Sequence, residues 1–151
     1  MSIVAGRPQA GSGYGSSARD ALLYKLQHIT ISPQGGIFFV ENNSVHKISA
    51  TSGLLATITG TGIAENSPDG VAVETPLFFP LGLSVSSSER VYIAEIDRIR
   101  VVDQNGFIST VAGIKETYGF TGDGGLATNA TFDRAVDVFA AASGVMSELE
   151  K

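Results

Sequence analysis

The stretch Phe107-Ile108-Ser109-Thr110-Val111-Ala112-Gly113 decides the fold, together with the loop Gly122-Asp123-Gly124-Gly125 that follows it. An apolar, β-prone run ends at a glycine, and a glycine-rich loop that contains an acid comes next. Weaker versions of the run occur earlier, as Ile3-Val4-Ala5-Gly6 and Thr57-Ile58-Thr59-Gly60. The closing glycines have nearly equal separations along the chain, 60 − 6 = 54 and 113 − 60 = 53. The chain is therefore built from repeats.

Two further markers have the same spacing. Phe38-Phe39-Val40-Glu41 is followed by Tyr92-Ile93-Ala94-Glu95 at a separation of 92 − 38 = 54. Asp69-Gly70 is followed by Asp123-Gly124 at a separation of 123 − 69 = 54. We call this spacing one repeat. A fixed period of this size is typical of a propeller or a solenoid.

These motifs resemble the NHL-repeat family of β-propellers, in its long-spaced variety. The matching stretches are Thr110 to Gly113, Gly122 to Thr128, and Val91 to Glu95 followed by Arg98 to Val101. The resemblance extends over nearly the whole chain and implies four-stranded antiparallel blades, which in relatives mostly close into a ring of six. The first copy departs most, because its loop Gly13 to Ser17 lacks the acid.

The sequence predicts an all-β partial β-propeller of about two and a half four-stranded antiparallel blades. One short helical turn is expected in the inter-blade loops, at Arg19 to Tyr24. The repeat copies span residues 3–59, 60–112 and 113–151, the last incomplete. The expected strands are residues 3–6, 28–32, 37–41, 45–48 and 54–59, then 81–86, 91–95, 98–102 and 107–112, and finally 136–140.

Two and a half blades do not close a ring, since propellers typically need 4–8 blades. We therefore expect either a fragment or truncated form of a longer propeller, or one arc of a ring that other copies complete. An open arc exposes apolar blade faces, which favours self-association through those faces. As a further hypothesis, Ile3 to Gly6 supplies the outer strand of the unfinished blade.

The composition indicates a folded chain with few options for chemistry. Hydrophobic residues make up 43% and charged residues 17%, so disorder is not expected. The absence of cysteine excludes disulfides and thiolate metal sites. The pI near 4.9 and the lack of a basic stripe argue against a nucleic-acid partner. No run approaches the roughly 18 apolar residues of a membrane span, so no membrane partner is expected.

Three residues suggest metal or phosphate binding. Asp123 lies in a glycine loop, but the alternating acids of a calcium loop and the Lys-Ser/Thr of a phosphate loop are missing. A turn-capping aspartate is the favoured interpretation. Some propeller lyases related to this fold hold zinc with several histidines. His28 and His46 are the only histidines here and fall on an inner and a third strand, so we expect no metal site.

Polar residues of the loops and turns do not form a catalytic set. Asp20 and Glu74 occupy equivalent loop positions in different copies, so they are not expected to act as an acid/base pair. Ser86, Ser87 and Ser88 have no histidine at an arguable position, and a turn explains them.

Arg98 and Arg100 flank Ile99 on a strand and suggest either contact with a phosphate or pairing with Glu95 or Asp97 at the hairpin; pairing is favoured. The glycosylation patterns that begin at Asn42 and Asn129 carry little weight, because such patterns are common by chance.

The expected function is a non-catalytic NHL-repeat scaffold that binds a protein or small ligand through its blade loops. In propeller enzymes, metal and acid/base groups gather where the inner strands begin. Here those positions carry His28, Gly82 and Asp137, which are too few metal-binding or acid/base residues for such a cluster. No catalytic, cofactor-binding or metal residue is therefore predicted. The alternative is a fragment of a propeller lyase or lactonase whose active site lies largely in missing blades.

Overall fold

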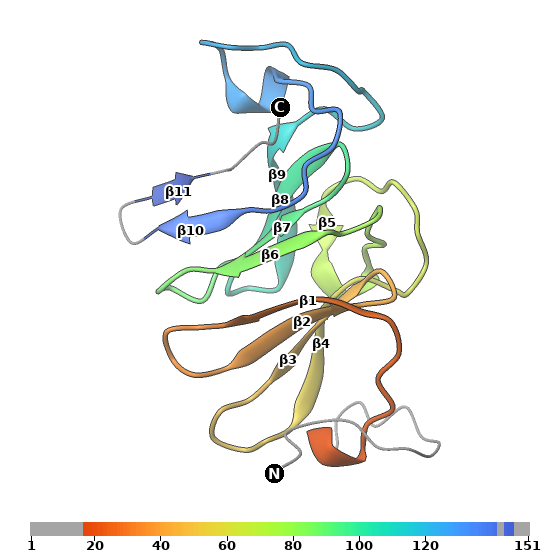
Figure 1. Ribbon diagram of the computed structural model, residues 1–151, viewed down its shortest axis with the longest axis vertical. Helices are drawn as coiled ribbons and strands as arrows, with labels where there is room; N and C mark the ends of the chain where they lie inside the picture. The colour runs from red at the N-terminus through yellow and green to blue at the C-terminus, as the bar shows by residue number, and fades with distance from the viewer. Residues whose placement is uncertain (1–16, 142–143, 147–151) are drawn as a thin grey trace.

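Three antiparallel sheets follow one another along the chain and stack side by side (Figure 1). The computed structural model describes residues 17–141 and 144–146. The first sheet has the order β1-β2-β3-β4, with β1 Leu26–Ile31, β2 Ile37–Glu41, β3 Ser44–Ile48 and β4 Leu55–Thr59. The second has the order β5-β9-β8-β7-β6, with β5 Gly70–Val71, β6 Gly82–Val85, β7 Val91–Ala94, β8 Arg98–Val102 and β9 Phe107–Gly113. The third pairs β10 Phe139–Ala141 with β11 Gly144–Met146.

This arrangement confirms the predicted all-β, partial-propeller fold. The second sheet differs from the expected blade because the loop before it adds β5 along β9 as a fifth strand. This short strand pairs with Phe107 and Ile108 at the start of β9, whose outer edge would otherwise present unpaired backbone groups there. The third sheet begins later than predicted. Residues 136–138 lie against β6, but only Phe139–Ala141 finds a strand partner in β11.

The helical content is limited to short 3₁₀ turns: η1 Ala18–Asp20, η2 Ala72–Glu74 and η3 Ala127–Asn129. The predicted turn at residues 19–24 is shorter than expected, because the backbone is already extended at Ala21. The starts of the three turns are separated by 72 − 18 = 54 and 127 − 72 = 55, so the turn is part of the repeat. No helix in the described residues has the length and hydrophobicity to cross a membrane.

The core lies between the sheets. Phe38 and Val40 of β2 pack against Leu83 and Ile93 of the second sheet. Tyr92 and Ala94, on alternate positions of β7, face the opposite way and pack with Phe132 and Val138 of the third repeat. A strand that is buried on both faces has a continuous apolar sequence. This pattern is why strands could be predicted at residues 37–41 and 91–95, where β2 and β7 lie.

The two ends of the sheets differ in how they connect. Each inner strand, β1, β6 and β10, runs from a long inter-blade loop toward a short turn (Figure 1). The long loops, residues 60–81 and 114–138, therefore begin and end at the same end as the hairpin turns 42–43 and 95–97, while residues 70–73 of the first loop reach the β8–β9 turn at the opposite end. We call this the long-loop end, and the opposite end the short-turn end. The predicted strand at residues 3–6 falls outside the described residues.

Candidate binding rim at the long-loop end

A buried glutamate fixes the end of the inter-blade loop in each complete blade. Glu41 at the end of β2 and Glu95 just after β7 are both buried and stand one repeat apart. Glu41 accepts a hydrogen bond from the backbone N–H of Tyr24. Glu95 accepts one from the N–H of Phe78 at 3.1 Å. Since Tyr24 and Phe78 are also one repeat apart, the contact is a repeated device that ties the loop to the blade.

The next residue in each loop adopts a left-handed conformation. Lys25 has φ 53° and Phe79 has φ 47°. This conformation costs about 1–2 kcal/mol for a residue other than glycine, and a bulky side chain in it is a genuine outlier. It occurs where the chain turns from the loop into the inner strand, and the contacts of Glu41 and Glu95 hold it there. The strain is therefore built into the repeat.

The anchored segments present aromatic and cationic side chains to solvent. Tyr24 is 68% exposed and Phe79 is 50% exposed. Lys25 Nζ lies 5.5 Å from the centre of the Tyr24 ring, and the Phe78 and Phe79 rings meet edge to face at 4.9 Å. We call these four residues the rim. An exposed aromatic pair on a fixed backbone provides a flat apolar contact surface at low entropic cost.

In the second blade, two buried arginines neutralise the charge of Glu95. Arg98 Nε lies 2.6 Å from Glu95 Oε2, and Arg100 Nη1 lies 3.7 Å from Glu95 Oε1. Arg100 also contacts Asp69 Oδ1 at 3.3 Å and the carbonyl oxygen of Pro68 at 2.9 Å. Burial raises the pKa of Glu95, while Arg98, Arg100 and the Phe78 N–H oppose the rise. Burial also lowers the pKa of Arg100, against the pull of Glu95 and Asp69.

In the first blade His46 takes the place of Arg100, one repeat earlier. Its Nε2 lies 3.6 Å from Glu41 Oε2, and its Nδ1 lies 3.2 Å from Thr57 Oγ1. Burial lowers the pKa of His46, and Glu41 partly offsets this. The buried glutamate therefore contacts two arginines in the second blade and a histidine in the first.

Asp97 joins the two long loops across the β7–β8 turn. Its Oδ2 accepts hydrogen bonds from Asn66 Nδ2 at 2.6 Å and from the Glu116 N–H at 2.8 Å. Within the described residues, Asp97 Oδ1, Asn66 Oδ1 and Arg98 Nη2 are buried without a hydrogen bond. Ordered water commonly completes such a polar cluster. The second blade thus holds the loops on either side of it through one buried carboxylate.

The prediction that Arg98 and Arg100 pair with hairpin acids is confirmed. Arg98 contacts both Glu95 and Asp97, the latter at 3.8 Å. The contact of Arg100 with Asp69 was not anticipated. Both arginine side chains are almost completely buried, so neither presents its guanidinium to a phosphate in solution.

The two histidines are not brought together. His28 on β1 pairs in register with Val40, whereas His46 on β3 pairs with Phe39. Neighbouring positions on β2 face opposite sides of the sheet, so the histidines lie on opposite faces with β2 between them. In the part of the chain that the structure describes, no three His, Cys, Asp or Glu side chains gather closely enough to hold a metal ion.

The acidic residues of the loops differ in their exposure and in their hydrogen bonds. Asp20 and Glu74 are exposed at equivalent places in η1 and η2 of separate blades. Asp69 accepts hydrogen bonds from Thr110 N at 3.0 Å and Thr110 Oγ1 at 2.9 Å. Asp123, its repeat equivalent, is exposed in a turn closed by Gly125 N to Gly122 O at 3.0 Å. The partners of Asp69 come from β8 and β9, and the described part of the third repeat has no strand equivalent to either.

The remaining polar motifs lie in turns. Ser86 Oγ accepts a hydrogen bond from the Arg90 N–H at 3.1 Å and contacts Ser88 Oγ at 3.0 Å, which confirms the predicted turn. Asn42 forms the β2–β3 turn with the next residue, and both have positive φ. Asn129 ends η3.

Sequence reasoning missed the rim. The available signal was a pair of aromatic residues one repeat apart, Tyr24 and Phe78, each close before an inner strand. It was not used because the left-handed turn and the glutamate contact depend on tertiary structure.

Comparison with known proteins supports the fold. No family model matches the chain. A Bacteroides thetaiotaomicron protein of unknown function superposes with a TM-score of 0.58 and 25% identity over 70% of this chain. An auxiliary nutrient binding protein from the same organism superposes with a TM-score of 0.62 and 21% identity over 80% of this chain. The chain spans only 27% and 33% of the lengths of these two proteins.

Proposed function

We propose that the chain is a non-catalytic, NHL-like scaffold that binds a protein or small ligand at its long-loop end. The observation that carries the proposal is the rim, where exposed aromatic side chains stand on a backbone fixed by buried Glu41 and Glu95. A surface that is held rigid before binding loses less conformational entropy when a partner arrives. The rim and the loops beside it therefore have the properties of a binding surface.

The long loops extend this surface with further exposed apolar side chains. Those that are at least half exposed and lie away from the β8–β9 turn are Ile63, Tyr118, Phe120 and Leu126. Apolar side chains gathered on loops at one end of a scaffold commonly mark an interaction site. The description of one structural neighbour as an auxiliary nutrient binding protein fits a binding role.

A scaffold fits the charged residues better than an enzyme does. The buried acids and bases of the second blade face each other and backbone groups, so they hold loops in place. A fragment of a propeller lyase or lactonase is the competing proposal. It predicts turnover of an ester, lactone or uronide substrate once the missing blades are restored.

The proposal is tested by amide chemical-shift mapping of the 151-residue chain against a panel of short peptides, sugars and nucleosides. We expect shifts for residues 24–25, 61–69, 75–81 and 114–131. Phe79→Ser should weaken binding of any hit at least tenfold. Phe107→Ser is the matched control, because Phe107 is 48% exposed, close to the 50% of Phe79, but lies at the short-turn end.

Shifts confined to the short turns at residues 33–36, 49–53, 86–90 and 103–106 would contradict the proposal. So would equal weakening by Phe79→Ser and Phe107→Ser. Hydrolysis or elimination of a panel compound by the purified chain would favour the enzyme.

A further inference from the structure

The first blade exposes a face that the later repeats bury. Ile29 on β1 is 66% exposed, whereas its repeat equivalents Leu83 and Val138 are 2% and 3% exposed. Leu83 is covered by the first blade and Val138 by the second. Ile31 is 67% exposed, and its equivalent Val85 is 7% exposed. We call the side of the first blade that carries Ile29 and Ile31 its rear face.

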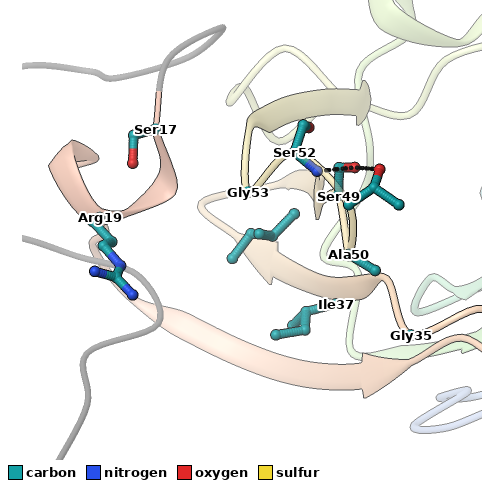
Figure 2. Close-up of a pocket in the computed structure, with 10 residues that line it drawn as sticks. Ser17, Arg19, Gly35, Ile37, Ser49, Ala50, Ser52 and Gly53 are labelled. Atoms are coloured by element: carbon teal, nitrogen blue, oxygen red, sulfur yellow. Dashed lines mark hydrogen bonds between the residues drawn. The ribbon is translucent and has the colours of Figure 1, made fainter.

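The groove in Figure 2 lies on the outer part of this rear face. It has a volume of about 640 Å³, with Ser17 and Arg19 on one side and the turn from Ser49 to Gly53 on the other. Ile37 and Ile48 also line it.

A second groove, of about 520 Å³, lies between the first and second blades. Most residues of its rear wall are the repeat equivalents of residues that line the groove of Figure 2. Val73, Glu89, Val91 and Val102 are the repeat equivalents of Arg19, Gly35, Ile37 and Ile48, respectively. Its other wall is the side of the first blade opposite the rear face, with Phe38, Lys47 and Ile58. We call this side of a blade its front face. The groove of Figure 2 is therefore an inter-blade groove with only its rear wall present.

The opposite end of the described chain exposes the matching front face. In the third repeat, Phe139 on β10 is 64% exposed. Its repeat equivalent Ser84 is 7% exposed, and Ser84 Oγ accepts a hydrogen bond from the Ala140 N–H at 3.0 Å across the contact with the third repeat. Within residues 17–141, one chain thus carries both halves of a blade-to-blade contact, exposed at Ile29 and Ile31 at one end of the arc and at Phe139 at the other.

We propose that the rear face of the first blade docks the front face of the third repeat of a second copy of this chain. The contact repeats the packing of β1 on β6 and of β6 on β10 inside the molecule. It is head-to-tail, so copies add around an axis until the ring closes. It does not depend on what the long loops bind.

The test is light scattering behind a sizing column, with three variants. Ile29→Lys/Ile31→Lys blocks the rear face, and Phe139→Lys blocks the front face. Phe120→Lys is the control, because Phe120 is 74% exposed but lies on a long loop. Wild type and control should run at a common multiple of 15.7 kDa. Each blocked variant should run at 15.7 kDa with an unchanged circular dichroism spectrum.

Mixing the two blocked variants gives the sharper result. The rear-blocked chain keeps a front face and the front-blocked chain keeps a rear face, so the mixture should form one complex of twice 15.7 kDa and nothing larger. A monomeric wild type would overturn the proposal, as would blocked variants that assemble like wild type or a mixture that stays monomeric. Ile31→Ser replaces the double variant if the lysines unfold the chain; it should lower the mass at a given concentration.

Discussion

Glu95 illustrates how a buried charge serves structure in this molecule. Its carboxylate is completely buried and contacts Arg98, Arg100 and the N–H of Phe78. Burying a charge is costly unless it is paired and hydrogen-bonded, so each of these partners is needed. The group holds the rim of the second blade, so removing one of its partners should destabilise the chain.

Arg98→Met should destabilise the chain strongly at neutral pH. It removes the nearest partner of Glu95 and leaves a carboxylate buried with one guanidinium at 3.7 Å. Breaking a buried pair in this way typically costs about 3–5 kcal/mol. Urea denaturation should show a loss of this size in the free energy of unfolding at pH 7. Because burial already raises the pKa of Glu95, protonation relieves the stranded charge, and the loss should shrink at about pH 5.

The double variant Glu95→Gln/Arg98→Met is the control for this prediction. It removes the stranded charge along with its partner, so it should be more stable than Arg98→Met at pH 7. A loss below about 1 kcal/mol for Arg98→Met, equal at both pH values, would show that the pair is not structurally important.

His46 should make stability fall with acid. Burial lowers its pKa in the folded chain below 6.5, and the charge of Glu41 offsets only part of this. Between that lowered pKa and 6.5, the unfolded chain binds more protons than the folded chain. Stability therefore falls as the pH drops below 6.5 and levels off below the folded pKa. Urea midpoints should show this slope in wild type and in the control His28→Gln, and a flatter one in His46→Gln. Equal slopes in all three chains would contradict the assignment.

For individual residues, the sequence predicted which charged side chains pair but not how deeply they are buried. The spacing of Glu95, Arg98 and Arg100 on a hairpin was enough to predict their pairing. Their burial was not predictable, because it requires the segments around Asn66 and Glu116 to fold over the hairpin. The rim residue Phe79 was missed for a similar reason, since its left-handed backbone is maintained by a contact with a residue in another element.

Two glycines shape the outer strands of the complete blades. Gly60 follows β4 with φ 91°, and Gly113 ends β9 with φ 90°. The ladder beside each contains a register shift, at Val45/His46 and at Ile99/Arg100. A Cβ at Gly113 would lie 2.5 Å from the Asp97 carbonyl oxygen, and one at Gly60 would lie 2.4 Å from that of Asn43. The glycines that marked the repeat in the sequence are thus required by a close backbone approach.

Gly113→Ala should be more destabilising than a matched glycine change without the close approach. Gly53→Ala is the control, because Gly53 also has positive φ, at 67°, but a Cβ there meets nothing within 4 Å. The control should lose about 1–2 kcal/mol for the left-handed conformation alone. Gly113→Ala should lose clearly more, because backbone must also move. Thermal and urea unfolding of both variants measure the difference. Equal losses would mean that the close approach is unimportant.

Element boundaries were predicted where the strand pattern is self-contained. Residues 37–41 and 98–102 were predicted with the bounds that β2 and β8 show. β5 was missed, because two residues of a loop become a strand only through the free edge of β9. Asn-Gly is a strong hairpin signal in a sequence, and Asn105-Gly106 lies in the turn between β8 and β9. However, only Gly106 has positive φ, and Asp103 Oδ1 closes the turn by accepting hydrogen bonds from the N–H groups of Asn105 and Phe107.

The molecule as a whole is an arc whose repeats are equivalent in backbone but not in surroundings. The central blade is covered on both faces, the first blade is open at Ile29 and Ile31, and the third repeat is open at Phe139. The repeat period predicted this arc from the sequence. It did not predict which loop residues would be presented for binding, because presentation depends on how loops from successive repeats meet at one end.

Hydrogen–deuterium exchange of the intact chain, resolved by peptide, tests the central claim that two equivalent blades support a fixed long-loop end. We predict slow exchange in β2 and β3 and, one repeat later, in β7 and β8, because these strands are paired on both edges. The Tyr24 and Phe78 amides should also be protected, since each donates to a buried glutamate. Protection that differs between the two blades, or fast exchange at both of these amides, would contradict the account.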